Sequence, residues 1–352
     1  MEKFNRKFSR EFFAAQNSYF GFINHFDRIF DSEKYTNIFI LKGGPGTGKS
    51  SIMKRVANRF TDTAAVTKIY CSSDINSLDG VIISNDTCRF AILDGTAPHE
   101  RDAKLPGAVD ELVNLGEFWD SEALGEKREE IISLNKQKKQ HYGAAYEFLA
   151  IAGTYAKKLK ANVNYCFDRI KAKQRIKEIC KNLEIGAESG KDLLLSAFGK
   201  NGYQTLPTAF TGVDEVVEIT GGYFSNQVFL NMLCDEISRR GIQRTLYPSP
   251  LDPEDIETVV VSDNKKSIAY TTRNAVKKLS VEEFLNKQPK DLSTFGLYLS
   301  DYEKYESLAK ENFSLASKTH FLLEDIYTPL MDFSMIDRVV LRIEKKISEA
   351  VE

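Results

Sequence analysis

The glycine loop Gly43-Gly44-Pro45-Gly46-Thr47-Gly48-Lys49-Ser50 constrains the fold of this chain more than any other segment. The apolar run at residues 37–41 precedes it and is typical of a buried strand. After the loop, apolar side chains recur at helical spacing at Ile52, Met53, Val56, Ala57 and Phe60. Strand, loop and helix in this order satisfy the G-x-x-x-x-G-K-[ST] pattern of a P-loop. The segment therefore predicts an α/β fold with a helix that begins directly after the glycines.

The residue types of the loop suit phosphate. Glycine adopts the positive φ that turns backbone N–H groups inward, and the helix start adds unpaired N–H groups and a positive dipole end. Lys49 is expected to reach the β- and γ-phosphates and Ser50 to ligate Mg²⁺. No Asn-Lys-x-Asp pattern that would select guanine occurs, which favours ATP. The predicted nucleotide-binding residues are Gly43, Gly44, Pro45, Gly46, Thr47, Gly48, Lys49, Ser50 and Ser51.

A second apolar run, residues 89–94, ends in the carboxylate of Asp94. A carboxylate at the end of such a strand can hold Mg²⁺ through its water shell, opposite Ser50. We therefore expect Ser50 and Asp94 to be the metal ligands.

The loop that follows this strand is polar. Loops at the carboxyl ends of strands carry ligands in open α/β sheets, so its side chains either face the γ-phosphate or a second substrate, or form a polar turn shaped by Pro98. The residues concerned are Thr96, His99, Glu100 and Arg101. The candidate catalytic residues are Lys49, Asp94, His99 and Glu100.

The chain also repeats itself. Residues 69–85 and 246–263 share a pattern of charged, branched apolar and small polar residues after one inserted residue. In the second copy Asn226 stands opposite Lys49, Gln227 opposite Ser50 and Thr272 opposite Asp94. The second copy is predicted to keep the core but to bind no triphosphate in the usual way.

Acidic residues kept in both copies are interpreted as structural. Asp74 and Asp252 form one such pair, each placed to cap the turn that follows it, and Asp79 and Glu257 form another.

The expected architecture is two tandem P-loop NTPase-type α/β units, each with a helical appendage. Residues 1–118 form the unit with intact Walker A and B motifs, 119–200 a helical arm, 201–286 the degenerate second unit and 287–352 a C-terminal helical arm. Each arm is expected to be an antiparallel helical hairpin. Basic stretches such as residues 136–140 suggest either a nucleic-acid-binding arm or a solvated helical face, and acidic neighbours favour the second.

Composition limits the partners and the cellular compartment that we expect for this chain. The 48 basic and 50 acidic residues give a formal net charge of -2, which favours neither nucleic acid nor a membrane surface as partner. The five cysteines have no C-x-x-C spacing, so reduced thiols are expected rather than a zinc site or a disulfide framework. With no signal peptide and no membrane span in the sequence, a cytoplasmic protein is expected.

The P-loop, the Ser77–Ile83 segment (residues 77–83) and Asp94-Gly95-Thr96-Ala97-Pro98-His99 together resemble an uncharacterised family of bacterial tandem P-loop ATPases. That family is known mainly from Firmicutes and is often labelled nucleotide kinase or ATP-binding protein. The resemblance covers nearly the whole chain and implies an NTPase fold, without a substrate. Members often carry a glycine-rich P-loop in the second half too, and this sequence departs from them there.

Three functions remain open at this point. The first is a Mg²⁺-dependent ATPase whose hydrolysis moves the helical arms or a protein partner bound to them. The second is a small-molecule or nucleotide kinase, which needs the same Lys49, Ser50 and Asp94. The third is a non-catalytic scaffold that ATP clamps together.

Overall fold

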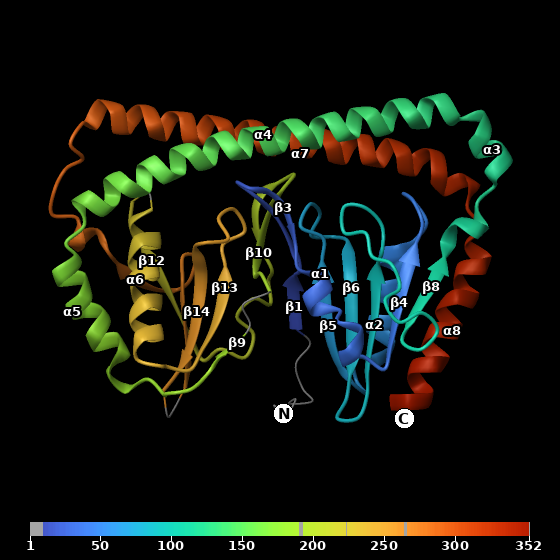
Figure 1. The fold of residues 1–352 in the computed structure, drawn as a ribbon, viewed down its shortest axis with the longest axis horizontal. Helices are drawn as coiled ribbons and strands as arrows, with labels where there is room; N and C mark the ends of the chain where they lie inside the picture. Colours follow the sequence, from blue (N-terminus) through green and yellow to red (C-terminus); the bar gives the residue numbers. More distant parts are fainter. Residues whose placement is uncertain (1–9, 190–192, 223, 264–265, 352) are drawn as a thin grey trace.

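The computed structural model describes residues 10–189, 193–222, 224–263 and 266–351. A six-stranded mixed sheet forms the N-terminal half, in the order β1-β5-β6-β7-β4-β8 (Figure 1). Strand β4, next to the edge strand β8, runs parallel to β7 and β8, whereas β6 runs antiparallel to β5 and β7. The strands are β1 (Arg10–Phe13), β4 (Asn37–Lys42), β5 (Ala65–Tyr70), β6 (Leu78–Ser84), β7 (Arg89–Asp94) and β8 (Asp110–Asn114).

The second half contains a sheet of the same design, in the order β16-β12-β15-β14-β13-β9. Each strand has a counterpart in the first sheet, with β12 matching β4 and β15 matching β7, and the strand directions agree pair by pair. The repeat predicted from the sequence is therefore confirmed as two tandem sheet units. The strands are β9 (Glu188–Ser189), β12 (Glu215–Thr220), β13 (Arg244–Pro248), β14 (Ile256–Ser262), β15 (Ser267–Thr271) and β16 (Lys277–Ser280).

One helix in each unit follows β4 or its counterpart β12 and packs on the sheet. Helix α2 (Lys49–Phe60) buries Ile52, Met53 and Val56 among the first sheet's apolar side chains. Helix α6 (Ser225–Arg239) buries Phe229 and Leu233 in the core of the second unit. The helical periodicity at residues 52–60 predicts the core face of α2 correctly.

The repeated aspartates cap turns, as expected. Asp74 Oδ1 accepts a hydrogen bond of 3.0 Å from the Asn76 amide, and Asp252 Oδ1 accepts one of 3.1 Å from the Glu254 amide. Both are Asx turns that satisfy backbone N–H groups before a strand begins.

Two long helices, α4 (Arg128–Cys166) and α7 (Leu292–Tyr327), lie side by side and antiparallel, and together span both sheets (Figure 1). Small residues such as Ala145, Ala152 and Ala309 lie in the core they share. The ring of Phe313 in α7 packs edge-on against Tyr146 in α4, with 5.6 Å between ring centroids. The predicted hairpin within each arm is therefore wrong, because the partner of each long helix comes from the other copy.

The helices that follow the long pair are exchanged between the units. Helix α5 (Arg169–Ile179) packs on α6, and helix α8 (Phe333–Val351) packs on α2. Ile336, Val340 and Ile343 of α8 belong to the core of the first unit, although their segment follows the second. Each unit is thus completed by a helix that arrives from the other half of the chain.

Two small hairpins lie among the sheets and long helices. Nδ2 of the buried Asn17 donates to the Phe198 carbonyl at 2.7 Å, and the Tyr146 hydroxyl donates to Asn17 Oδ1 at 2.8 Å. These bonds tie both hairpins to α4. The remaining elements are β2 (Ala15–Ser18), β3 (Gly21–Asn24), β10 (Ser196–Gly199), β11 (Gly202–Thr205), α1 (Phe26–Ile29), α3 (Ser121–Glu126) and the 3₁₀ turns η1 (Ser32–Lys34), η2 (Leu115–Phe118), η3 (Cys180–Asn182), η4 (Glu282–Phe284) and η5 (Thr328–Leu330).

Two further expectations concern the whole chain. All five cysteines are free thiols. Within the described residues, none of the helices combines the length and the apolar character needed to cross a membrane.

Candidate functional site

The glycine loop, residues 43–50, connects the carboxyl end of β4 to α2. Gly46 has φ +70° and Gly48 φ +78°, the left-handed region that glycine adopts without a steric penalty. Thr47 Oγ1 donates to the Gly44 carbonyl at 2.9 Å and closes the loop. The backbone at the start of α2 is thereby held in a tight turn.

Lys49 and Asp94, predicted to act together, lie together. Lys49 Nζ donates to the carbonyls of Gly43 at 2.7 Å and Gly44 at 2.9 Å, and lies 3.7 Å from Asp94 Oδ2. Since β7 runs beside β4 with Leu41 opposite Asp94, this carboxylate reaches the loop directly. Asp94 Oδ1 accepts from the amide and hydroxyl of Thr96, and Oδ2 points to the lysine. An ammonium ion and a carboxylate therefore flank the loop.

Ser50 lies in the first turn of α2. Its Oγ accepts a 2.9 Å hydrogen bond from the Leu78 amide, which ties the start of β6 to the helix. The hydroxyl keeps a second lone pair for a cation. Ser51, also predicted to contact the nucleotide, is exposed on the same turn.

His99 is buried beside Asp79, a residue that the repeat in the sequence predicted to be structural. Its Nε2 lies 3.3 Å from Asp79 Oδ2, and its Nδ1 lies 3.1 Å from the Thr96 carbonyl oxygen. Burial lowers the pKa of His99, and burial raises the pKa of Asp79 well above its usual range, with further increase from the charge of Asp94. Asp79 therefore belongs to the site, and its place as the second residue of a buried strand in both copies was the available signal.

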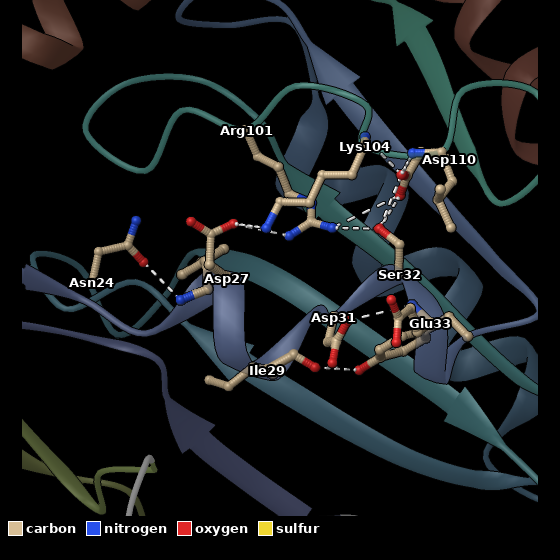
Figure 2. Close-up of polar contacts among 12 residues, drawn as sticks. Asn24, Asp27, Ile29, Asp31, Ser32, Glu33, Arg101, Lys104 and Asp110 are labelled. Carbon is tan, nitrogen blue, oxygen red and sulfur yellow. Dashed lines mark hydrogen bonds and ion pairs between the residues drawn. The ribbon is translucent and has the colours of Figure 1, made fainter.

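Two residues of the loop after β7, Glu100 and Arg101, lie in different surroundings. The Arg101 guanidinium is buried away from the glycine loop and contacts Asp27 at 3.2 Å, Ser32 at 2.9 Å and Asp110 at 3.8 Å (Figure 2). The polar-turn interpretation therefore holds for Arg101, because its donors fix the loop to the framework. Glu100 is exposed, and its catalytic role stays a prediction.

The end of α7 covers the glycine loop, which the sequence did not indicate. A methyl group added to Gly46 would come within 2.5 Å of Thr328 Oγ1, so the two segments are in contact. The Gly46 amide donates to the Glu324 carboxylate, whose pKa is lowered first by the hydrogen bond from His320 and also by this amide and by the charge of Lys49. A side-chain anion thus occupies one of the loop's amide donors.

Aromatic side chains also lie beside the glycine loop, near the end of α7. The Trp119 indole lies 3.2 Å from a methyl group placed on Gly44, and its ring centroid is 5.3 Å from that of Tyr327. Trp119 Nε1 is buried without a hydrogen-bond partner among the described residues. The loop therefore has an apolar wall built from η2 and the end of α7.

Lys138 of α4 adds a second ammonium ion. Burial lowers the pKa of Lys138 first, and the charges of Lys49 and Lys139 lower it further. In the basic stretch at 136–140, interpreted as a solvated face, Lys138 is therefore half-buried and near enough to Lys49 for the two charges to interact.

Comparisons with family models, curated proteins and solved structures find no match to this chain. The resemblance to tandem P-loop ATPases accordingly stays a prediction.

The corresponding region of the second unit is built differently. Its loop, residues 221–227, is one residue shorter than residues 43–50. Gln227 Nε2 donates to the Ile256 carbonyl at 2.8 Å, at the position where Ser50 binds the Leu78 amide. This shared contact supports the sequence alignment that places Gln227 opposite Ser50.

A cavity of about 210 Å³ lies beside this second loop, and Asn226 and Thr272 line it. Lys160 Nζ bridges Asp252 and Asp255 there, at 2.5 Å from each carboxylate. The lysine that reaches this cavity is therefore neutralised by its own carboxylates.

Proposed function

We propose that the chain binds ATP with Mg²⁺ at the glycine loop and hydrolyses it. The observation that carries the proposal is the position of Lys49, folded over the loop carbonyls and 3.7 Å from Asp94 Oδ2. An ammonium ion held between a glycine turn at a helix start and a strand-end carboxylate suits a triphosphate and its metal ion.

The residues fit the two groups that the proposal requires. Gly46 and Gly48 have the positive φ that lets successive N–H groups face a phosphate. Lys49 would move from the loop carbonyls to the β- and γ-phosphate oxygens. Ser50 Oγ and Asp94 Oδ2 would hold Mg²⁺, which neutralises charge that develops on the phosphates.

The contact between Glu324 and the Gly46 amide supports a coupling between ATP hydrolysis and movement of the long helices. A phosphate that enters the loop meets a carboxylate on the Gly46 amide, and like charges repel. ATP binding would therefore displace the end of α7, and α7 runs along α4 to the second unit. A helix moved at one end by the nucleotide can transmit that movement to the other half of the chain or to a bound protein partner.

The test is the fate of the γ-phosphate of labelled ATP incubated with the purified chain and Mg²⁺. Release of free phosphate that disappears in Lys49→Ala supports the ATPase. Transfer of label to a small molecule would identify the kinase alternative instead, and bound but unchanged ATP would identify the scaffold. Circular dichroism of Lys49→Ala must match that of the wild type, so that loss of activity is not loss of folding.

A further inference from the structure

Three potential metal-ligating side chains converge beside the glycine loop. One ligand atom each of Asp79, Asp94 and His99 lies within 4.8 Å of the others. Asp79 comes from β6, Asp94 from the end of β7 and His99 from the loop that follows, so three segments build the cluster. Asp79 and His99 are buried, at 7% and 5% exposure.

The contact between Asp79 and His99 lacks a positive group. The Thr96 carbonyl oxygen beside Nδ1 can only accept, so this partner assigns the ring hydrogen to Nδ1. In that neutral tautomer, Nε2 turns a bare lone pair toward Asp79 Oδ2 at 3.3 Å. Two acceptors at this distance repel unless a cation or a proton lies between them.

The second unit shows how the carboxylate that corresponds to Asp79 is paired there. Glu257 is the second residue of β14, as Asp79 is the second residue of β6. Glu257 is fully buried and is paired with the Arg273 guanidinium and the Ser196 hydroxyl. Thr272, which precedes Arg273, corresponds to Asp94, so the position of Arg273 is held by Gly95 in the first unit.

No lysine or arginine of the described residues replaces this guanidinium at Asp79. The only ion-pair contact of Asp79 there is with His99. The charge of Lys49 is felt at Asp79, but the ion pair of Lys49 is with Asp94, at 3.7 Å. Buried carboxylates are normally paired or bound to metal, and among the described residues no guanidinium or ammonium group forms an ion pair with Asp79 as Arg273 does with Glu257.

We propose that Asp79, Asp94 and His99 bind a divalent first-row transition-metal ion, which takes the place that Arg273 holds in the second unit. Two carboxylates and an imidazole suit Mn²⁺, Co²⁺ or Zn²⁺ better than Mg²⁺, which prefers oxygen ligands. His99 Nε2 and Asp79 Oδ2 are 3.3 Å apart, a separation that suits neighbouring ligands with bonds of about 2.0–2.2 Å to one ion. This ion is separate from the Mg²⁺ of the proposed ATPase, shares only Asp94 with it, and binds without nucleotide.

The test uses the full chain, stripped with EDTA, and titration with CoCl₂ in the absence of nucleotide. Visible absorption of bound Co²⁺ reports the ligand field, and isothermal titration reports stoichiometry. We expect one Co²⁺ per chain, competed by Zn²⁺ and not by Mg²⁺. Asp79→Asn and His99→Gln should each weaken binding by at least about tenfold and change the spectrum.

Matched variants separate this site from the nucleotide site. Asp102→Asn removes a carboxylate from the same loop, 95% exposed, and should bind Co²⁺ like the wild type. Lys49→Ala and Ser50→Ala should lose ATP binding or Mg²⁺-dependent turnover yet keep Co²⁺. Thermal unfolding checks the folding of each variant, and if Asp79→Asn does not fold, His99→Gln alone decides.

The proposal is overturned by wild-type chain that binds no Co²⁺, Zn²⁺ or Mn²⁺. It is also overturned if folded His99→Gln binds Co²⁺ with the wild-type affinity and spectrum, or if Ser50→Ala loses Co²⁺ instead. Failure of the ATPase with intact Co²⁺ binding would leave this metal site standing and remove only the proposed function.

Discussion

The Glu324 carboxylate, at the end of α7, accepts a hydrogen bond from the backbone amide of Gly46 in the glycine loop. Residues of the C-terminal helical segment thereby occupy a donor that a phosphate oxygen would need. Because the same carboxylate also feels the charge of Lys49, it imitates part of a phosphate group. The described conformation is thus closed over the loop by the chain itself.

Glu324→Gln should raise the affinity for ATP about five- to tenfold. The substitution keeps the shape of the side chain but removes the negative charge that competes with the phosphates, and hydrogen bonds to charged groups are the stronger ones. Equilibrium titration with a slowly hydrolysed ATP analogue measures the change. Asp325→Asn, an exposed carboxylate at the next position, is the control and should leave affinity unchanged. Equal or weaker binding by Glu324→Gln would show that this carboxylate does not oppose the nucleotide.

Lys138→Ala should weaken ATP binding about three- to tenfold. The half-buried Lys138 ammonium lies close enough to Lys49 for their charges to interact, and each would gain from a triphosphate between them. The neighbouring exposed Lys139→Ala serves as the matched control. The same titration decides: if the two variants bind alike, Lys138 has no part in the site.

Asp94→Asn should reduce Mg²⁺-dependent turnover far more than nucleotide binding in EDTA. The amide keeps the hydrogen bonds to Thr96 that order the loop but loses the charge that attracts the metal ion. Rates of phosphate release are compared with affinities measured without Mg²⁺. A similar loss in both assays would mean that Asp94 acts through the structure of the loop.

Ile343→Ala in α8 should destabilise the chain by about 2–4 kcal/mol, the range for truncating a buried branched side chain. Ile343 is fully buried in the core of the first unit. Its helix α8 follows α7 and therefore reaches this core from the second half of the chain. Leu341→Ala on the same helix, 62% exposed, should change stability by less than about 0.5 kcal/mol. Urea unfolding measures both, and equal effects would contradict the exchange of helices between the units.

Much of the framework was predictable from spacing alone. The buried strands at residues 37–41 and 89–94, the core face of α2 and the repeat of the sheet follow from periodicities that local geometry imposes. The pairing of α4 with α7 did not follow, because an apolar stripe shows that a helix has a partner without showing which one. Alanines such as Ala145 and Ala309 fit either arrangement.

The polar residues that form the candidate site could be predicted from the sequence. The contact of the end of α7 with the glycine loop could not. Lys49, Ser50 and Asp94 converge because a strand–loop–helix motif and a neighbouring parallel strand fix them. Asp79 was assigned to the framework because Glu257 repeats it, yet of the two only Glu257 has an arginine counterion among the residues that the structure describes. Glu324 lies in a helical run of mixed charge, where no local pattern indicates a contact with a loop far away in the sequence.

The most direct test of the central claim is the number of ATP molecules bound per chain. Asn226 cannot replace the charge of Lys49, Gln227 is held by the Ile256 carbonyl, and Arg273 is committed to Glu257. Isothermal titration with a slowly hydrolysed ATP analogue and Mg²⁺ should therefore give one site per chain, and Lys49→Ala should abolish it. A stoichiometry near two, or normal affinity in a folded Lys49→Ala chain, would contradict the account.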